Sequence, residues 1–418
     1  MMKFVHRSFI ALVLTVAIHS FARTIHVLKD EPSIQGGIDA ASNGDTVLVA
    51  PGTYNEDINF NGKAITVASS NGPTVTTIHG DGEEQVVTFA AGEAQPSVLR
   101  GFTITNGFAC CNNPAGGISI YNSSPKIVAN ILTKNAGCGI AVYYGAPIIE
   151  NNIISFSSTT SACPPAQGSG ILLYGQGTPY GMGSVQIIGN IITHNGGPYS
   201  SWGAGIYLWI GGAPLIQNNI IAWNEAANNG GGITMQNSGA PLIVQNLIVD
   251  NKAETYGGGL DLEIPDDGST AVMVNNTIAG NTTVNSDGQT GPEVYLSGFY
   301  GTVTFWNNII TGATENAVVF GDPLYRAPSP SFNHNDAFST KGGAYAGTCA
   351  GETGKKGNLS ANPKFVDPAK EGYQLQKGSP AINAGTNAAP HIPPKDLAGH
   401  PRIVGGIIDM GAYEYQGK

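Results

Sequence analysis

The chain contains 418 residues, carries a formal net charge of −10 at pH 7, and includes 58 glycines. Only 11% of its residues are charged, well below the ~25% of ordinary soluble domains. Binding to nucleic acid or to an anionic membrane requires a basic patch. We therefore expect neither class of partner.

The first 22 residues have the pattern of a secretory signal peptide. Basic residues precede a short apolar run, Phe9–Ile18, and small residues at Ser20 and Ala22 fit a cleavage site. A membrane anchor is the alternative, but this run is about half the length that spans a bilayer. We predict a monomeric secreted protein, extracellular or periplasmic, without a membrane span.

The mature chain begins with a predicted strand at 24–27 and a short helix over 33–41. Ser33 can cap this helix, and Ile34, Ile38 and Ala41 share one of its faces. Such a helix would plug the open end of a stack of strands. The stretch SIQGGIDAASNGDTVLVAPGTYNEDI, residues 33–58, resembles the opening of secreted right-handed β-helix proteins, including the pectate lyase-like and pectin methylesterase-like families.

One phrase, seen clearly in APLIQNNIIAW at 213–223, recurs seven times at variable spacing. The positions three before and two after its asparagine are apolar in every copy, as expected for two buried strands flanking a bend. Variable spacing at a fixed phrase indicates one structural turn per repeat, with insertions in loops. The aligned asparagines are Asn130, Asn152, Asn190, Asn219, Asn246, Asn276 and Asn308.

A second, glycine-led phrase completes each repeat, as in GGISI at 116–120 and GGLDL at 258–262. Three short strands in each repeat of about 22–35 residues predict a parallel β-helix, and the resemblance implies that it is right-handed. We expect roughly ten coils over residues 23–311. Residues 312–418 are predicted to form an irregular C-terminal segment and cap.

The C-terminal segment contains NLSANPKFVDP, YQLQKGSPAINAG, DLAGHPR and DMGAYE. It resembles the segment that closes many bacterial β-helix surface proteins of the choice-of-anchor group. The resemblance implies a cap, although those proteins typically have Asp where this chain has Asn383. Asp396, Arg402 and Asp409 are expected to form a structural charge network, with a calcium site as the alternative.

Four of the five cysteines fall on one loop edge of three successive coils. In an oxidising compartment they would form one or two disulfides between neighbouring coils. Buried free thiols are the second interpretation, and a metal site is the third. The four candidates are Cys110, Cys111, Cys138 and Cys163, with Cys349 left over.

Strand alternation in the glycine-led phrase assigns two columns of side chains to the outside of the sheet. Aromatic rings there would stack on sugar rings; alternatively, inserted loops would cover them as a stabilising ladder. The predicted substrate-binding residues are Tyr121, Tyr143, Tyr174, Tyr207, Trp209, Gln236 and Tyr295.

Acidic residues adjoin these aromatics. Asp261 and Glu263 lie two residues apart on one face, with Asp266 and Asp267 just beyond. Three interpretations stand: Ca²⁺ ligands, the acid and base of glycoside hydrolysis, or ordinary solvated acids. The predicted catalytic residues are Asp261, Glu263 and His194, and the predicted calcium ligands are Asp261, Glu263, Asp266 and Asp267.

Motifs of related enzyme families are missing from the sequence. The segments DFIFG and LGRPW of pectin methylesterase-like proteins do not occur, nor does the ordered NTD, DD, GHG and RIK set of polygalacturonase-like proteins. We therefore predict an exported protein that binds polysaccharide or surface glycan. A polysaccharide lyase or hydrolase and a non-catalytic surface or matrix protein both remain open.

Overall fold

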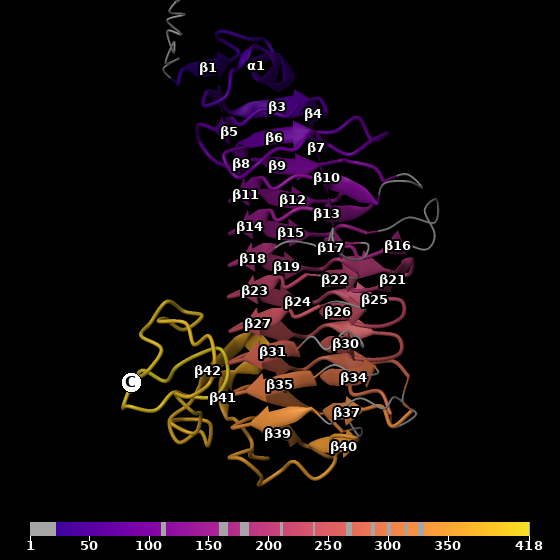
Figure 1. Cartoon of the computed structure of the whole chain (residues 1–418), viewed down its shortest axis with the longest axis vertical. Coiled ribbons are helices and arrows are strands. Elements are labelled where there is room, and N and C mark those ends of the chain that lie inside the picture. The colour runs from indigo at the N-terminus through magenta and orange to yellow at the C-terminus, as the bar shows by residue number, and fades with distance from the viewer. Residues whose placement is uncertain are drawn as a thin grey trace, which may run out of the picture.

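The computed structural model describes residues 22–109, 114–158, 166–175, 184–209, 212–236, 239–264, 270–285, 289–298, 302–313, 317–324 and 330–417. Within these ranges the chain winds through stacked coils that give one strand to each of three long parallel sheets (Figure 1). The predicted parallel β-helix is confirmed. The predicted signal peptide lies outside the described residues except for Ala22.

Three sheets form the sides of the helix, and each runs its whole length. Sheet A contains β1 (Thr24–Val27), β2 (Thr46–Val49), β5 (Thr66–Ser69), β8 (Val98–Arg100), β11 (Lys126–Val128), β14 (Ile148–Glu150), β18 (Gln186–Ile188), β23 (Leu215–Gln217), β27 (Leu242–Val244), β31 (Thr270–Val274), β35 (Thr302–Trp306) and β38 (Ser331–Asn333). Sheet B contains β3 (Gly52–Asn55), β6 (Thr76–His79), β9 (Thr103–Thr105), β12 (Ile131–Thr133), β15 (Ile153–Ser155), β19 (Ile191–Thr193), β24 (Ile220–Ala222), β28 (Leu247–Val249), β32 (Thr277–Ala279), β36 (Ile309–Gly312) and β39 (Asp336–Ser339). Sheet C, led by the glycine phrase, contains β4 (Ile58–Asn59), β7 (Val87–Phe89), β10 (Ala115–Tyr121), β13 (Cys138–Tyr143), β17 (Ile171–Tyr174), β22 (Ile206–Trp209), β26 (Ile233–Gln236), β30 (Leu260–Ile264), β34 (Val294–Gly298), β37 (Val319–Gly321) and β40 (Tyr345–Gly347).

Shorter strands lie outside these three sheets. One group forms an outer layer beside the turns that lead from sheet B to sheet C: β16 (Ala166–Gln167) pairs with β21 (Ser200–Trp202), and β20 (Gly196–Gly197), β25 (Glu225–Ala226), β29 (Lys252–Ala253) and β33 (Thr282–Thr283) form a four-stranded sheet. The C-terminal segment contains the antiparallel pair β41 (Phe365–Asp367) and β42 (Gly372–Leu375), joined through the 3₁₀ turn η1 (Pro368–Lys370).

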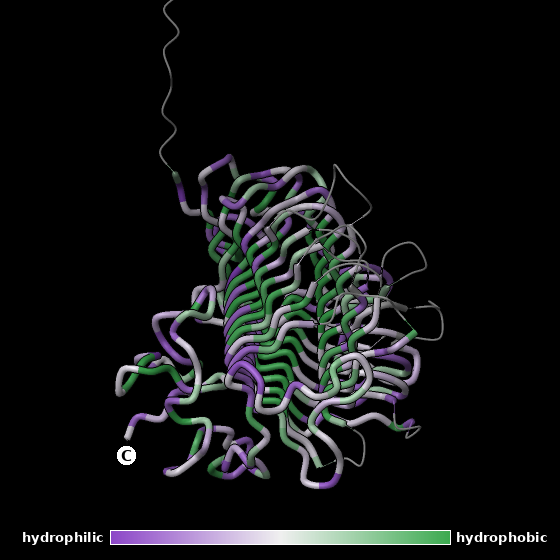
Figure 2. Tube along the Cα trace, turned by 60° about the horizontal axis from the view of Figure 1, so that its bottom comes forward, coloured by the Kyte–Doolittle hydropathy of each residue, from purple (hydrophilic) through white to green (hydrophobic). Residues whose placement is uncertain are grey.

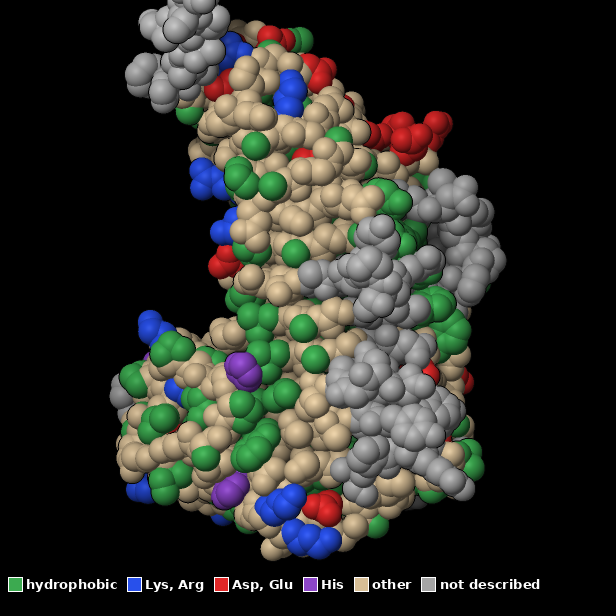
Figure 3. Space-filling view, in the orientation of Figure 1, with side chains coloured by type: hydrophobic (Ala, Val, Ile, Leu, Met, Phe, Trp, Pro, Cys, Tyr) green, Lys and Arg blue, Asp and Glu red, His purple; other side chains and the backbone are tan. Residues whose placement is uncertain are grey.

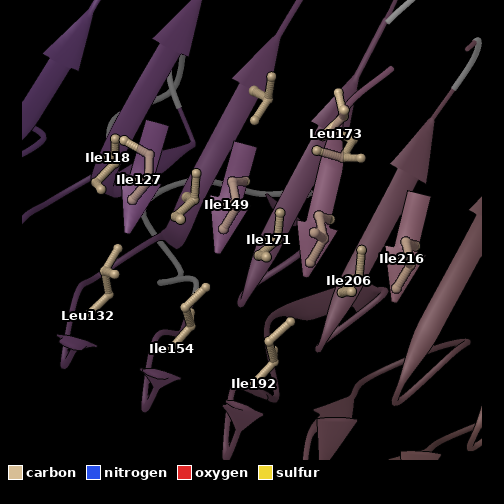
Figure 4. Close-up of a cluster of buried hydrophobic side chains, with 14 of the residues drawn as sticks. Ile118, Ile127, Leu132, Ile149, Ile154, Ile171, Leu173, Ile192, Ile206 and Ile216 are labelled. Atoms are coloured by element: carbon tan, nitrogen blue, oxygen red, sulfur yellow. The ribbon is translucent and has the colours of Figure 1, made fainter. Parts of the chain in front are cut away.

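The interior is built from aliphatic side chains that repeat at the same position in every coil. Ile127 and Ile149 stack in sheet A, and Leu132, Ile154 and Ile192 stack in sheet B, all fully buried (Figure 4). Figure 2 shows these hydrophobic positions in register along the coils. Burial of each side chain contributes about 1.5–3 kcal/mol, so the repeated phrase both sets the register and stabilises the stack.

The predicted asparagine column forms a buried ladder at the turn from sheet A to sheet B. The backbone N and Nδ2 of Asn219 both donate to Asn246 Oδ1, each at 2.9 Å, and Nδ2 also donates to the Ile187 carbonyl. The residue before each of these asparagines adopts left-handed backbone geometry, as Asn218 does at φ 58°. The ladder extends past the seven predicted members to Asn335 and Asn358.

A second asparagine ladder, which the sequence reading missed, lines the turn from sheet B to sheet C. Its members stand five residues after those of the first ladder: Asn135, Asn195, Asn224, Asn251 and Asn281, with Ser157 replacing asparagine in one coil. Asn224 N and Nδ2 donate to Asn251 Oδ1 at 3.0 and 2.9 Å. Glu293 ends the ladder, accepting from Asn281 Nδ2 at 2.7 Å, and burial raises the pKa of its carboxyl to about 8.

Helix α1 (Ile34–Ala40) closes the N-terminal end of the coil stack, as predicted (Figure 1). Gly36 N donates to Ser33 Oγ at 3.0 Å, which confirms Ser33 as the N-cap. Ile34 and Ile38 are fully buried against the first coils. The helix therefore covers apolar side chains that would otherwise meet water.

The coils continue beyond the predicted boundary at residue 311. Strands β37 to β40 add to all three sheets, and Leu359 still pairs with Asp336. The repeat was hard to follow there because aromatic and small residues, Phe332 and Ala337, replace the usual isoleucines. The β-helix thus extends to about residue 359.

The remaining segment packs against the flank of the helix rather than across its end (Figure 1). Tyr373, Ala412 and Tyr413 pack on the outward side chains of sheet B, including Leu247 and Val249. Figure 3 shows hydrophobic side chains gathered where this segment meets the helix. The segment therefore covers an apolar flank that the coils alone would leave exposed.

Arg402 holds the C-terminal segment together from inside. Its Nη2 donates to the carbonyls of Asp409 and Gly411 at 3.1 and 2.6 Å, and its Nη1 lies 3.6 Å from Glu414 Oε2. The side chain is 1% exposed. Burial lowers the pKa of Arg402 to about 10, so the guanidinium is charged at neutral pH. The predicted network is thus found only in part: the ion pair of Arg402 is with Glu414, whereas Asp409 accepts through its backbone carbonyl, and the charges of Asp409 and Asp396 only oppose the lowering of the Arg402 pKa.

Candidate functional site on the outer face of sheet C

Four aromatic side chains line consecutive strands of sheet C, and we call them the aromatic strip: Tyr121, Tyr143, Tyr174 and Trp209. The strands pair in register, with Tyr143 opposite Tyr174 and Tyr174 opposite Trp209. Successive ring centroids lie 6.5, 5.3 and 5.4 Å apart. Tyr121 is 47% exposed, and the other three rings are partly buried. The strip is therefore a row of mutually packed rings that reaches water most freely at Tyr121.

The neighbouring outward column lies outside the central core yet is buried. Leu172, Tyr207, Asp261 and Tyr295 are 1%, 0%, 3% and 5% exposed. The turn that contains Gly203 packs closely against Tyr207. Gly203 adopts φ 62°, and a Cβ at this position would lie only 2.5 Å from the Tyr207 Cβ, so a larger residue would clash there. Tyr207 and Tyr295, which were predicted as substrate-binding residues, are therefore buried beneath the outer surface of sheet C.

Gln236 and Tyr207 link the two columns. Tyr207 Oη donates to Gln236 Oε1 at 2.6 Å. Gln236 lies on the next strand, β26, directly opposite Trp209. Burial raises the pKa of the Tyr207 hydroxyl, with the charges of Glu263 and Asp261 adding to the effect. Tyr207 therefore stays protonated and orients the Gln236 amide at the end of the aromatic strip.

Asp261 and Glu263 both lie on β30 and share its outward face, as predicted. The pKa of Asp261 is raised to about 8, chiefly because the carboxyl is buried; a hydrogen bond from Asn229 opposes the shift, and the charge of Glu263 adds to it. Glu263 is only half-buried, and burial raises its pKa as well. Asp261 is thus a protonated, enclosed acid at neutral pH, and Glu263 is the member of the pair that meets solvent.

Tyr295 belongs to a second polar and aromatic group on the same face. Its Oη donates to Asp322 Oδ2 at 2.6 Å, and its ring stacks on Tyr256 at 4.4 Å. Asn229, Tyr256 and Asp322 were not predicted from the sequence because they lie on turns outside the repeated phrases. The GGG runs that follow Asn229 and Tyr256 mark these turns but do not indicate which side chains face the sheet.

His194 lies on a different corner of the helix from Asp261 and Glu263. It follows β19 at the end of sheet B, and its ring lies between those of Phe156 and Trp223. Thr193 Oγ1 lies 2.8 Å from its Nδ1. The structure therefore does not bring together the three predicted catalytic residues.

The predicted calcium site is only partly covered by the described residues. Calcium takes several oxygen ligands, and of the four predicted ligands the structure describes Asp261 and Glu263. Within the described ranges no three His, Cys, Asp or Glu side chains gather in a metal-binding group. Asp266 and Asp267 lie outside those ranges, and the calcium site stays a prediction that depends on them.

The cysteine predictions are also only partly covered by the described residues. Cys138 is buried at the start of β13, beside Ala115, Ala141 and Leu172. Cys110, Cys111 and Cys163 lie outside the described residues, so the disulfides stay a prediction. Cys349 is buried in the last coil. No helix in the described part of the chain has the length and hydropathy of a membrane span.

Known proteins resemble this chain in fold. The family described as "Right handed beta helix region" matches residues 33–221 and 116–352. No curated protein matches the chain significantly. Among solved structures, an alginate lyase from Paenibacillus sp. str. FPU-7 is 14% identical, with 78% of this chain and 98% of that one covered and a TM-score of 0.36.

Two further structures give similar values. The A-module of the mannuronan C-5 epimerase AlgE6 from Azotobacter vinelandii is 14% identical, over 79% of this chain and 94% of its own, with a TM-score of 0.45. The pectate lyase Pel9A is 14% identical, over 95% and 97%, with a TM-score of 0.37. Similarity at this level concerns the path of the backbone alone.

Proposed function

Since the chain belongs to the right-handed β-helix family, we propose that it is an exported protein that binds a neutral polysaccharide along the aromatic strip of sheet C. The observation that carries the proposal is the register of four aromatic rings on four consecutive strands. Sugar rings present an apolar face that stacks on aromatic rings and polar edges that take hydrogen bonds. Gln236 and Glu263, next along the face, supply such hydrogen-bonding groups.

Charge supports a neutral polymer over a polyuronate. The chain carries 29 acidic and 19 basic residues, and the strip leads toward Glu263 rather than toward a cation. A polyanion would meet like charge there unless a cation bridged the two. Export rests on the signal-like residues 1–22.

Binding without cleavage is favoured by the burial of Asp261. A general acid must reach the glycosidic oxygen of its substrate, and Asp261 is 3% exposed. Glycoside hydrolysis is the second candidate function, favoured by one observation: Asp261, with a pKa of about 8, holds a proton beside the more exposed Glu263. The two functions differ in whether a bound polymer is shortened.

The test is affinity electrophoresis and calorimetry with neutral polysaccharides and polyuronates, with and without calcium. Trp209→Ala and Tyr174→Ala should each weaken binding by about 2- to 10-fold, because a lost ring contact is worth ~0.5–1.5 kcal/mol. Trp306→Ala, a partly buried tryptophan on sheet A, is the matched control. Equal binding by all variants would contradict the site, and release of reducing ends would support the hydrolase.

A further inference from the structure

A second aromatic surface runs along the corner between sheet B and sheet C. Phe156, His194 and Trp223 occupy the same turn position in three successive coils, and we call them the corner platform. Their φ values are 53°, 55° and 58°. Left-handed geometry is uncommon for bulky side chains and is taken up more readily by Gly, Asn or Asp. Three bulky rings in a row at such a position are not explained by backbone preference.

The rings of the corner platform stack and remain open to water. Phe156 and His194 have centroids 5.1 Å apart with ring planes inclined by 27°, and His194 and Trp223 lie 6.3 Å apart at 21°. Phe156 is 55% exposed and Trp223 is 45% exposed. In the aromatic strip only Tyr121 is comparably open, and the other three rings are partly buried. The corner platform therefore offers an apolar track along the helix axis, in which the rings stack on one another, their edges meet water, and Trp223 is the end ring on the side of Asp250.

The track leads into a hollow with polar walls. After Trp223 the same turn position holds Asp250 and then Gly280. A Cβ on Gly280 would stand 2.8 Å from Asp250 Oδ1, so the glycine leaves this space open. A hollow of about 300 Å³ lies here, lined by Trp223, Glu225, Asp250, Lys252, Gly280 and Thr282.

A larger hollow of about 610 Å³ adjoins the first at Asp250 and Gly280 and lies between the helix and the C-terminal segment. Tyr373, from that segment, donates to Asp250 Oδ2 at 2.9 Å across the junction. Lys252 Nζ lies 2.6 Å from Glu225 Oε1, and Lys364 also lines the larger hollow. Acidic and basic groups are balanced here, in contrast to the acidic chain as a whole.

We propose that the corner platform and the adjoining hollow form a second glycan-binding site, which takes one end of a linear neutral oligosaccharide. The terminal sugar enters the hollow and stacks on the outer face of Trp223, and Glu225, Asp250, Lys252 and Thr282 hydrogen-bond its hydroxyl groups. The sugars that follow lie along the exposed edges of His194 and Phe156. Apolar ring surface beside a few polar groups of both charges suits a neutral sugar. The proposal does not rest on the aromatic strip, since it shares no residue with it.

Calorimetry with defined hexasaccharides tests the site: β-1,4-linked gluco-, manno- and xylo-oligomers, and β-1,3-linked gluco-oligomers. We expect at least one to bind, with Trp223→Ala and Phe156→Ala each weakening its binding severalfold and their combination abolishing it. Thr282→Arg, which fills the hollow from an exposed position, should also abolish it. Trp306→Ala should leave it unchanged, and the melting temperatures of all variants are measured in parallel.

Repeating the titrations in a Trp209→Ala background separates this site from the aromatic strip, because the strip is weakened there while the losses caused by Trp223→Ala and Thr282→Arg should persist. Loss of binding in Trp209→Ala alone would assign the oligosaccharide to the strip and overturn the proposal. Failure of every hexasaccharide to bind the wild type would overturn it as well. A wild-type dimer that Trp223→Ala converts to a monomer would show that a second copy covers the platform instead.

Discussion

Asp261 and Glu263 lie two residues apart on β30 and share the outward face of sheet C, yet only Glu263 meets solvent. The turns that lead into sheet C close over the column that contains Asp261, and the column that contains Glu263 stays partly open. The same division separates Tyr207 from Trp209 on β22. Alternation along the strand therefore turns both positions outward, and the turns decide which of them is buried and which stays at the surface.

Burial of Asp261 predicts a pH-dependent stability. Its pKa is raised from 3.8 to about 8, so between these values the folded state holds a proton that the unfolded state releases. The free energy of unfolding then falls as the pH rises from about 4 to about 8, by up to ~1.4 kcal/mol per pH unit for one such group. Glu293 acts in the same direction. Urea unfolding of Asp261→Asn at several pH values should show a shallower slope than the wild type, and an unchanged slope would contradict the assignment.

The two asparagine ladders predict losses of stability without loss of binding. Asn219→Ala removes the oxygen that accepts from Asn190 N and Nδ2, at 2.8 and 3.0 Å. Each buried donor left without a partner costs about 1–3 kcal/mol. Asn224→Ala in the second ladder should behave alike, since Asn195 loses the same two contacts. Denaturant unfolding measures the loss, and calorimetry on the folded fraction should give wild-type affinity.

The buried contacts of Arg402 predict that removal of its side chain loosens the C-terminal segment. Arg402→Ala leaves Glu414 buried without its cation and removes the two hydrogen bonds to the carbonyls of Asp409 and Gly411. Breaking a buried pair from one side costs about 3–5 kcal/mol. We expect limited proteolysis to remove the segment after about residue 359 while the coils survive. Cleavage at the same rate as in the wild type would show that Arg402 is not needed, and that the apolar contacts of the segment and its hydrogen bonds to the coils, such as that from Tyr373 to Asp250, are sufficient.

The coil architecture could be predicted because its physical signals are repeated. An isoleucine at a fixed distance from a buried asparagine appears in nearly every coil, so chance matches are averaged out. The second ladder has the same signal, an asparagine five residues later, and could have been found in the same way. The continuation to residue 359 was missed because Phe332 and Ala337 change the side chains while keeping Asn335.

The site was less predictable because burial on the outer face depends on the turns. Alternation places Tyr207 and Asp261 outside the central core, but whether a turn covers them depends on glycines such as Gly203, far from the repeated phrase. His194 was grouped with the acids because the sequence does not give the direction of a turn residue. Its neighbours in the fold, Phe156 and Trp223, stand 38 and 29 residues away in the chain, at the repeat spacing.

The central claim is that the aromatic strip binds a neutral polysaccharide without cutting it. The most direct measurement is calorimetric titration of wild type, Trp209→Ala and Glu263→Gln with the polymer that the wild type retains best in affinity electrophoresis, followed by an assay for reducing ends. We predict that Trp209→Ala binds the polymer more weakly and that Glu263→Gln is folded. None of the three proteins should shorten the polymer. Wild-type cleavage that Glu263→Gln abolishes would contradict this account and identify a glycoside hydrolase.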